Sequence, residues 1–447
     1  MDTQISQAEL IKPNAADPTL SDLDKPPASP PRHIRRWFIV GVIFLGIVFN
    51  YVDRQIVSIL KPEIKAEFHL DDRGFAFILN LFTVCYALMY PVTGWLVDRI
   101  GPRIVMLTGV VTWSIACIGG GLARTVGMFG FFRGLLGLAE PTNFPAQVKV
   151  VTIWFPGRLR ATANSLCVAG SSIGAIIAPP FIAFLAQRHG WHAAFIVPGI
   201  IGLMVAAAWW LVYHDPPRDV QEEVAISDAT QVDAPAFTWP QLWRTRSLWG
   251  ILLIRFVSDP VWYFCLFWLP GYLREESGLS LTQIGLFGWI PFLAADLGGI
   301  GTSAWSDGMV RRGTAPLRAR KTMLISVAGF GLFCGLTPFV DNAYGTIAIF
   351  SVVAAVCISW LFSLSVVIAE TFPAKNVASV LGIAGGFGAA GAVIFNTYVG
   401  NNISSIGADR LFIIMAFLHP LAAVLLATVV RPEKPEKTKQ VVIQCLK

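Results

Sequence analysis

The sequence predicts an all-α polytopic membrane protein with twelve transmembrane helices arranged as two six-helix repeats. Three observations support this fold class. Of the 447 residues, 55% are hydrophobic and only 14% are charged, whereas about 25% of the residues in soluble domains are charged. The apolar residues form blocks of about 20 residues, the length of helix that crosses a bilayer. A segment of the first half also recurs in the second half.

The apolar blocks between polar breaks give the twelve predicted spans. In the first half they cover approximately residues 37–59, 75–96, 104–122, 126–149, 161–184 and 192–213. In the second half they cover approximately residues 249–272, 281–305, 322–340, 345–370, 376–400 and 410–431. We therefore expect one six-helix bundle over residues 37–213 and a second over residues 249–431.

The segments outside the spans are polar. Residues 1–36 are rich in Pro and Asp, which predicts a disordered cytoplasmic tail without a signal peptide. Residues 214–248 predict a cytoplasmic linker, and residues 432–447 predict a second cytoplasmic tail. Most Lys and Arg residues lie in loops on the side of the N-terminus, and positively charged loops remain inside the cell. Both termini are therefore expected in the cytoplasm, and the protein in a bacterial inner (plasma) membrane.

The internal repeat relates the fifth span to the eleventh. WFPGRLRATANSLCVAGSSIGAI (154–176) matches TFPAKNVASVLGIAGGFGAAGAV (371–393) at a constant offset of 217 residues. In this alignment Phe155 corresponds to Phe372, and Gly174 corresponds to Gly391. Parallel six-helix repeats are typical of transporters that bind their substrate between the two halves, near the middle of the membrane.

Several classes of function are excluded by what the sequence contains. Six of the seven Cys residues fall within apolar spans and the seventh, Cys445, lies in the tail, which argues against a disulfide scaffold. No Cys/His cluster indicates a metal site, and no nucleophile elbow or phosphate loop indicates an enzyme. The net charge of +6 comes from the loops and does not indicate nucleic-acid binding. We expect no cofactor, only a proton gradient as the driving force.

The stretch GWLVDRIGPR (94–103) connects the second and third spans. Asp98 follows the end of a helix, Arg99 and Arg103 lie in the short turn, and Gly101 permits that turn. Such charges could form a cytoplasmic latch between the two bundles; alternatively, they only set the topology. The stretch resembles the signature loop of the major facilitator superfamily, which implies the fold but no substrate.

The first span contains Asp53 and Arg54, although a charge at the bilayer centre costs roughly 2.5 to 3.5 kcal/mol. Neighbouring helical residues point about 100° apart, so these two side chains need partners in other spans. In the fourth span Arg133 and Glu140 share nearly one face, with Gly137 between them. The four charged side chains predict a proton-and-anion relay. The alternative is a structural lattice of salt bridges.

The second half contains fewer embedded charges. Arg255 and Asp259 have the i, i+4 spacing of a helical ion pair, and Asp296 precedes a glycine-rich stretch. We regard these three residues as candidate gating residues, the alternative being structural roles. Trp262 and Trp289 could provide a flat surface for a sugar ring, although Trp residues also mark the membrane interface.

Beyond the signature loop, several segments resemble the anion:cation symporter family, and most of all the bacterial hexuronate (glucuronate and galacturonate) transporters. In the first half these segments are NYVDR (50–54), YALMYPVTGWLVDRIG (86–101), FRGLLGLAEPTNFPA (132–146) and WFPGRLRATANSLCVAGSSIGAIIAPP (154–180). In the second half they are RFVSDPVWYFCLFWLPGYL (255–273) and LFGWIPFLAADLGG (286–299). The resemblance extends from about residue 37 to about residue 430.

The resemblance implies roles for residues of the first half. The carboxylates at Asp53 and Glu140 match the proton-coupling pair of the related aldonate transporters. Arg54, Tyr51 and Tyr86 match residues that contact the substrate there.

Further residues are expected at the substrate site, and some of them differ from those of the relatives. We also expect Arg133 and Ser171 to contribute to the substrate site. Ser171 and Ser172 replace a Gln-containing version found in galactonate-type relatives, and Gly385 stands where those relatives carry Asn. These departures put a galactonate-type pocket in doubt and leave another hydroxylated acid as the expected substrate.

These observations predict a monomeric secondary transporter that imports an organic anion, a hexuronate or related sugar acid, with protons by alternating access. Its partners would be the substrate, protons and the lipid bilayer. One alternative is a symporter for another carboxylate, such as an aldonate, a dicarboxylate or an aromatic acid. A second alternative is an efflux antiporter for drugs or metabolites.

Overall fold

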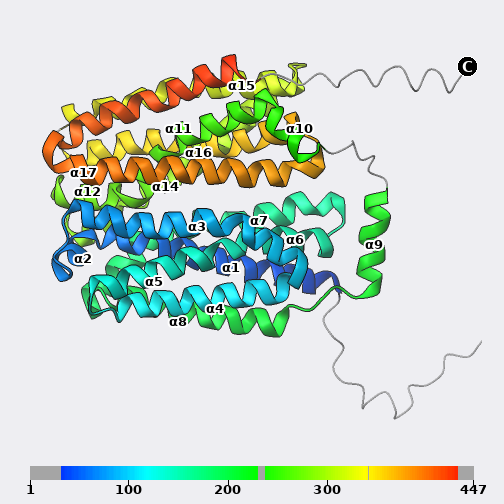
Figure 1. The fold of residues 1–447 in the computed structure, drawn as a ribbon, viewed down its shortest axis with the longest axis horizontal. Coiled ribbons are helices and arrows are strands. Elements are labelled where there is room, and N and C mark those ends of the chain that lie inside the picture. Colours follow the sequence, from blue (N-terminus) through cyan, green and yellow to red (C-terminus); the bar gives the residue numbers. More distant parts are fainter. Residues whose placement is uncertain (1–31, 230–236, 341, 431–447) are drawn as a thin grey trace, which may run out of the picture.

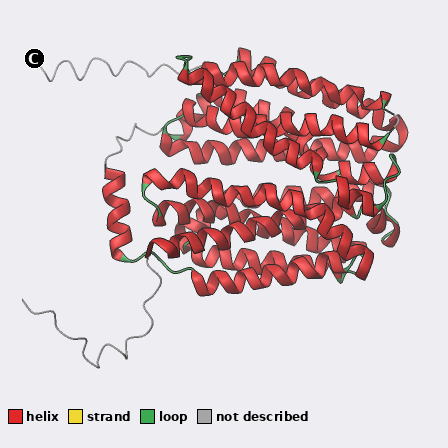
Figure 2. Ribbon diagram, turned by 180° about the vertical axis from the view of Figure 1, so that it is seen from behind, coloured by secondary structure: helices red, strands yellow, loops and turns green. Residues whose placement is uncertain are grey.

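The structure is a computed structural model that describes residues 32–229, 237–340 and 342–430. Within these ranges the chain is helical and contains no strand (Figure 2). The predicted tails lie outside the described residues, except that the first helix begins at Arg32, within the segment expected to be a tail. The helices form two stacked bundles, one from each half of the chain (Figure 1).

The elements of the first bundle are α1 Arg32–Ile59, α2 Lys61–Glu67, α3 Asp72–Ile100, α4 Pro102–Gly121, α5 Val126–Ala139, η2 Glu140–Thr142, α6 Asn143–Trp154, α7 Gly157–His189 and α8 Ala193–Val212. The predicted linker contains α9 Arg218–Ala229 and α10 Trp239–Arg244. The second bundle comprises α11 Arg246–Phe267, α12 Leu269–Glu275, α13 Leu281–Phe287, α14 Ile290–Arg311, α15 Pro316–Ala328, η3 Gly329–Phe339, α16 Ala343–Thr371 and α17 Ala374–Thr428.

Eleven helical segments of the described residues are long and apolar enough to cross a membrane. The predicted span 126–149 is missing from this set because it is interrupted by the 3₁₀ turn η2. Pro141 and Pro145 lack the N–H that an α-helix requires, which accounts for the interruption. The backbone at Glu140 stays helical (φ −60°, ψ −35°). A twelfth crossing made of α5, η2 and α6 remains a prediction.

The two spans predicted over 376–400 and 410–431 form the single element α17. Gly407 interrupts it with a φ of 77° and a ψ of 158°, and separates the two apolar segments Ser379–Ile403 and Gly407–Thr428. A positive φ is readily adopted only by glycine, so the chain can reverse here without a longer loop.

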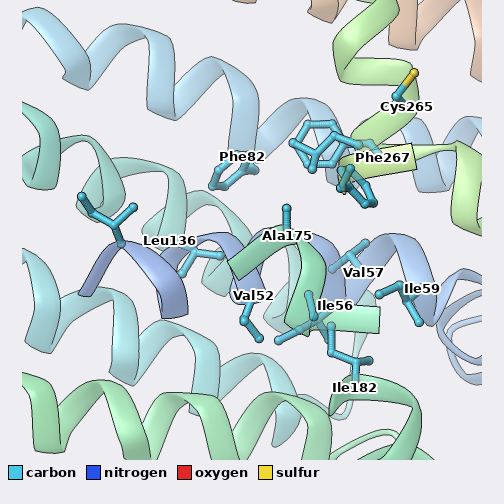
Figure 3. Packing of buried hydrophobic residues seen from close by; sticks show 14 of the residues in the cluster. Val52, Ile56, Val57, Ile59, Phe82, Leu136, Ala175, Ile182, Cys265 and Phe267 are labelled. Atoms are coloured by element: carbon cyan, nitrogen blue, oxygen red, sulfur yellow. The ribbon is translucent and has the colours of Figure 1, made fainter. Parts of the chain in front are cut away.

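The repeated glycines allow close helix packing in each bundle. On α7, a side chain at Gly174 would collide with the carbonyl oxygen of Val48 on α1. On α17, a side chain at Gly391 would collide with the carbonyl oxygen of Phe256 on α11. Figure 3 shows α1, with Val52 and Val57, running beside the part of α7 that carries Ala175 and Ile182, and the amide of Gln55 on α1 donates a hydrogen bond of 3.1 Å to the carbonyl of Ala175. The internal repeat therefore has a structural counterpart, since small residues let membrane helices approach each other.

The molecule has two distinct ends. The short helices α2 and α12 lie together at one end, and α9 and α10 lie at the other (Figure 1). Helix α1 begins, and α17 ends, on the side that carries α9 and α10. We call the first the α2/α12 end and the second the linker end.

Candidate substrate and ion-binding site

Asp53 and Arg54 are both buried on α1 and contact different elements. The Nε of Arg54 donates a hydrogen bond to Oε2 of Glu140 over 2.7 Å. Oδ1 of Asp53 lies 3.4 Å from Sγ of Cys117 on α4, a weak donor. Arg54 is therefore ion-paired, whereas Asp53 forms no ion pair with any described residue.

Glu140 occupies the turn η2, where the predicted fourth span is interrupted. Its side chain is fully buried, and Oε2 receives the hydrogen bond from Arg54. Oε1 has no hydrogen-bond partner among the described residues, and the nearby Asn50 side chain forms no well-aligned hydrogen bond with it. A carboxylate with one ion-paired oxygen and one unpaired oxygen has a site at which it can accept a proton.

Aromatic rings surround the guanidinium of Arg54. Its Cζ lies 4.7 Å from the ring centroid of Tyr86, 5.0 Å from that of Tyr51 and 5.7 Å from that of Phe82. Cation–π contacts of this kind hold a cation while leaving its N–H groups unused. Nη2 of Arg54 has no partner among the described residues. Since Nε is already bonded to Glu140, the two terminal nitrogens of the guanidinium are the donors left for a ligand carboxylate.

Arg133 lies on α5 and is 2% exposed. Its Cζ is 5.0 Å from the ring centroid of Phe82, and none of its three guanidinium nitrogens has a hydrogen-bond partner among the described residues. It interacts electrostatically with both Glu140 and Asp53. Burying a guanidinium without hydrogen bonds costs free energy. Arg133 would therefore be stabilised if the side chain of Asp53 or Glu140 moved to form an ion pair with it.

Ser171 is located on α7 beside Tyr51, and its hydroxyl donates to the carbonyl of Val168 over 2.6 Å. The structure thus brings together seven of the residues selected from the sequence. They are Tyr51, Asp53, Arg54, Tyr86, Arg133, Glu140 and Ser171.

In the second bundle, Nη2 of Arg255 lies 3.2 Å from Oδ2 of Asp259, so these two residues form an ion pair within α11. Asp296 on α14 accepts a hydrogen bond of 2.7 Å from Ser172 on α7, which connects the two bundles. No described basic side chain pairs with Asp296.

The two tryptophans considered for a sugar-binding surface have apolar neighbours. Trp262 packs edge-on against Phe292, with 6.1 Å between the ring centroids. Trp289 lines an apolar groove of about 490 Å³ with residues of α7, among them Phe181 and Phe184. The structure thus places Trp289 at the α7–α13 surface and not beside Arg54.

The stretch predicted to be a latch joins α3 and α4. Asp98 and Arg99 lie in the last turn of α3 and Arg103 lies in the first turn of α4, so the expectation that Asp98 follows the helix end and that both arginines lie in the turn is wrong. Only Gly101 separates the two helices. Asp98 pairs with Lys149 over 2.8 Å within the first bundle. The Cζ of Arg99 lies over Trp95, and that of Arg103 lies over Trp210. Gly101 adopts a φ of 92°, as the tight turn requires.

A cluster of charges at the α2/α12 end was not predicted from the sequence. Nζ of Lys61 lies 3.1 Å from Asp72 and 2.5 Å from Glu275, although the side chain is 3% exposed. Arg274 and Glu63 form a two-pronged ion pair with distances of 2.5 and 2.8 Å. Since Glu275 and Arg274 belong to α12, the Lys61–Glu275 and Glu63–Arg274 ion pairs join the two bundles. The polar stretch KPEIKAE after the first span was the available signal.

Lys65 belongs to the same cluster. Partial burial disfavours its charge, but hydrogen bonding to Asp72 and the charge of Glu275 outweigh burial and raise the pKa of Lys65 above its usual value. Lys65 therefore remains positively charged at physiological pH.

An apolar groove of about 520 Å³ lies between α3 and α5. It is lined by residues such as Phe77, Leu81 and Phe131 and contains none of the charged residues described above. Such a surface suits lipid, and we assign no polar ligand to it.

Comparison with known proteins identifies the family. The sequence matches the family model described as Major Facilitator Superfamily over residues 43–319 and 315–443. The chain belongs to the Major Facilitator Superfamily. Its fold is similar to that of a bacterial homologue of the human lysosomal transporter Spinster in an inward-facing and occupied conformation. The TM-score is 0.71 with 17% identity, covering 90% of this chain and 99% of the other.

Three curated relatives of this facilitator are named as sugar-acid transporters. It is 30% identical to the galacturonate transporter of Dickeya chrysanthemi over 59% of this chain and 79% of the relative. It is 28% identical to the hexuronate transporter of Escherichia coli K12 over 89% and 94% of the two chains. It is 27% identical to a probable galactarate/D-glucarate transporter of Bacillus subtilis over 87% and 90%.

These findings confirm several predictions from the sequence. The facilitator is a multi-span membrane protein whose relatives are transporters and not enzymes. The resemblance to bacterial hexuronate transporters is also confirmed.

Proposed function

We propose that this facilitator imports a sugar acid, a hexuronate or a related compound, together with protons by alternating access. The names of its relatives, which include galacturonate, hexuronate and galactarate/D-glucarate transporters, support this substrate class. The observation that carries the mechanism is the buried Arg54–Glu140 ion pair, with the unpaired Asp53 next to Arg54. Acids and bases embedded in a membrane domain are usually functional.

In this proposal the substrate carboxylate and Glu140 compete for Arg54. Protonation at the unpaired Oε1 removes the charge of Glu140 and weakens its hold on Arg54. The guanidinium then pairs with the carboxylate of the substrate while the rings of Tyr51 and Tyr86 hold it in place. Proton binding and substrate binding are therefore favourably linked, and by reciprocity each strengthens the other.

Asp53 provides a second proton site in this scheme. It forms no ion pair with a described residue, and Cys117 supplies only a weak hydrogen bond. Arg133 lies within electrostatic reach of both acids and can stabilise whichever of them is ionised. Proton release from Asp53 and Glu140 would restore the Arg54–Glu140 pair and expel the substrate.

The orientation predicted from the basic loops puts the linker end in the cytoplasm and the α2/α12 end in the periplasm. With that orientation, the ion pairs of Lys61 and Arg274 join the bundles on the periplasmic side. We infer that this arrangement closes the site to the periplasm. Import would then require these ion pairs to break and re-form once per cycle.

The proposal is tested by uptake of labelled galacturonate into proteoliposomes with an inward-directed proton gradient. Accumulation above equilibrium is expected, and an uncoupler should abolish it. Asp53→Asn, which cannot exchange a proton, should lose accumulation. Uncoupler-insensitive accumulation by the wild-type protein would refute proton coupling, and gradient-driven accumulation by Asp53→Asn would refute the role of Asp53.

A further inference from the structure

Two stripes of side chains face each other across the boundary between the bundles, each built with the four-residue spacing of one helix face. The stripe on α3 consists of Phe82, Tyr86 and Tyr90. The stripe on α11 consists of Arg255, Asp259, Tyr263 and Phe267. Phe82 meets Phe267 edge-on, with 6.1 Å between the ring centroids (Figure 3).

The same stripes bring Arg54 and Arg255 to one region. Tyr263 on α11 interacts electrostatically with both arginines. Tyr90 on α3 also interacts with both. Two tyrosines from opposite bundles thus lie within reach of the two guanidinium groups. Arg54 belongs to the first bundle and Arg255 to the second, so the cations approach this region from opposite sides.

The two cations also lie at different depths. The Phe82–Phe267 contact marks the side toward the α2/α12 end, and Arg54 lies beside Phe82 and Tyr86. Along α11, Arg255 lies eight positions before Tyr263, which corresponds to a rise of about 12 Å. Arg255 is therefore displaced toward the linker end. This staggered placement suits a chain-like ligand better than a compact anion.

Arg255 retains unused hydrogen-bonding capacity. Among the described residues, Asp259 is the acid with which it pairs, through Nη2 alone. The hydroxyl of Ser258 lies 3.4 Å from Oδ1 of Asp259, and Gly388 packs directly against Oδ2. A guanidinium has five N–H donors, so Arg255 can bind a second carboxylate without leaving Asp259. The second bundle therefore offers an arginine–acid pair comparable to Arg54–Glu140.

We propose that Arg255 binds a second carboxylate of the substrate, and that the preferred substrates are dicarboxylic sugar acids that span from Arg54 to Arg255. This inference rests on the proposed function. It assigns one end of a six-carbon diacid to each bundle. A hexuronate has only one carboxylate, so it would pair with Arg54 and leave Arg255 bound to Asp259 alone. The competing interpretation is that Arg255 and Asp259 form a structural ion pair with no substrate contact.

The test measures how unlabelled galactarate, a diacid, and unlabelled galacturonate, a monoacid, inhibit uptake of labelled galacturonate into proteoliposomes. In the wild-type protein, galactarate is expected to inhibit at the lower concentration. Arg255→Gln should raise the half-inhibitory concentration of galactarate about 10-fold or more, since charged hydrogen bonds are lost. The half-inhibitory concentration of galacturonate should change less than about 2-fold, because its single carboxylate pairs with Arg54 and does not contact Arg255.

Control variants separate recognition from folding. Arg255→Lys keeps the charge but not the planar fork, and should lie between the wild type and Arg255→Gln for galactarate. Asp259→Asn removes the internal partner and should leave galactarate at least as potent. The assignment would be overturned if a properly folded Arg255→Lys variant changed the half-inhibitory concentrations of galactarate and galacturonate equally. It would also be overturned if neither concentration changed. If the wild-type protein transports no sugar acid, the proposed function fails and this inference fails with it.

Discussion

Arg54 combines an ion pair and an aromatic cage around one guanidinium. Glu140 takes its Nε, three rings approach its Cζ within 6 Å, and Nη2 remains without a partner. This geometry differs from that of a purely structural salt bridge, in which the donors and acceptors would be fully used. At this scale the central question is which carboxylate, that of Glu140 or that of the substrate, occupies the guanidinium.

Replacing Arg54 by Lys tests the need for a planar fork. Lysine keeps the positive charge but cannot donate two parallel hydrogen bonds to a carboxylate. We expect Arg54→Lys to raise the KM for galacturonate about 10-fold or more, consistent with loss of a charged hydrogen bond. Transport kinetics in proteoliposomes provide the measurement, with Arg188→Lys, the same change at an exposed residue of α7, as a control that should leave KM unchanged. An unaltered KM in Arg54→Lys would argue against direct carboxylate binding.

The sequence was informative about the residues of the first bundle and less so about their pairing. The rarity of charges in apolar spans identified Asp53, Arg54, Arg133 and Glu140. Helix geometry indicated that Asp53 and Arg54 contact different partners. Nothing in the sequence indicated that Cys117 would contact Asp53, because that contact depends on how α4 packs against α1. The sequence also did not predict the neighbours of Trp289, since a tryptophan can pack against a sugar ring or an apolar surface equally well.

At the scale of elements, apolar block length located the helices, whereas their interruptions depended on local chemistry. The turn η2 puts Glu140 at a break that hydropathy alone does not register. Backbone hydrogen bonds are lost at such a break, and polar groups can gather there only where the protein shields them from lipid. The charged cluster of α2 and α12 was missed for a different reason: its members lie more than 200 residues apart in the chain.

The paired glycines of α7 and α17 lead to a prediction about stability. Ala at Gly391 would force its Cβ against the carbonyl oxygen of Phe256 and push α17 away from α11. We expect Gly391→Ala to destabilise the protein by about 1–3 kcal/mol, the usual cost of overpacking. Gly382→Ala is the matched control, because nothing lies within 4 Å of its Cβ position on the same helix. Thermal unfolding in detergent should show a lower Tm for Gly391→Ala alone; equal Tm values would contradict the packing role.

At the scale of the whole molecule, the ion pairs of the α2/α12 end join two bundles that also share one hydrophobic core, in which Phe82 of α3 meets Phe267 of α11. Glu63 and Arg274 are partly exposed, so their ion pair contributes modestly, on the order of 1 kcal/mol. Even that amount shifts a two-state equilibrium about fivefold. The cluster can therefore influence which conformation is populated without locking the transporter.

A charge exchange tests this role. Glu63→Arg or Arg274→Glu alone places like charges together and should disfavour the closed α2/α12 end. The double variant Glu63→Arg/Arg274→Glu should restore closure, because the ion pair is re-formed with reversed polarity. Closure can be followed by the rate of disulfide formation between cysteines introduced at Gln187 and Thr282, whose Nε2 and Oγ1 atoms form a 3.0 Å hydrogen bond between α7 and α13. Single variants that cross-link as fast as the unmodified pair would show that the cluster does not control closure.

The central claim is that protonation of Glu140 releases Arg54 for the substrate, and Glu140→Gln tests it most directly. Glutamine mimics the protonated acid permanently, so the variant should bind galacturonate at least as well as the wild type and exchange it across the membrane. Accumulation driven by a proton gradient should be lost, and the affinity should vary less with pH between about 5 and 8 than in the wild type. The measurement compares galacturonate exchange and gradient-driven uptake in the same proteoliposomes. Exchange without accumulation is the expected result; full gradient-driven accumulation by Glu140→Gln would contradict the account.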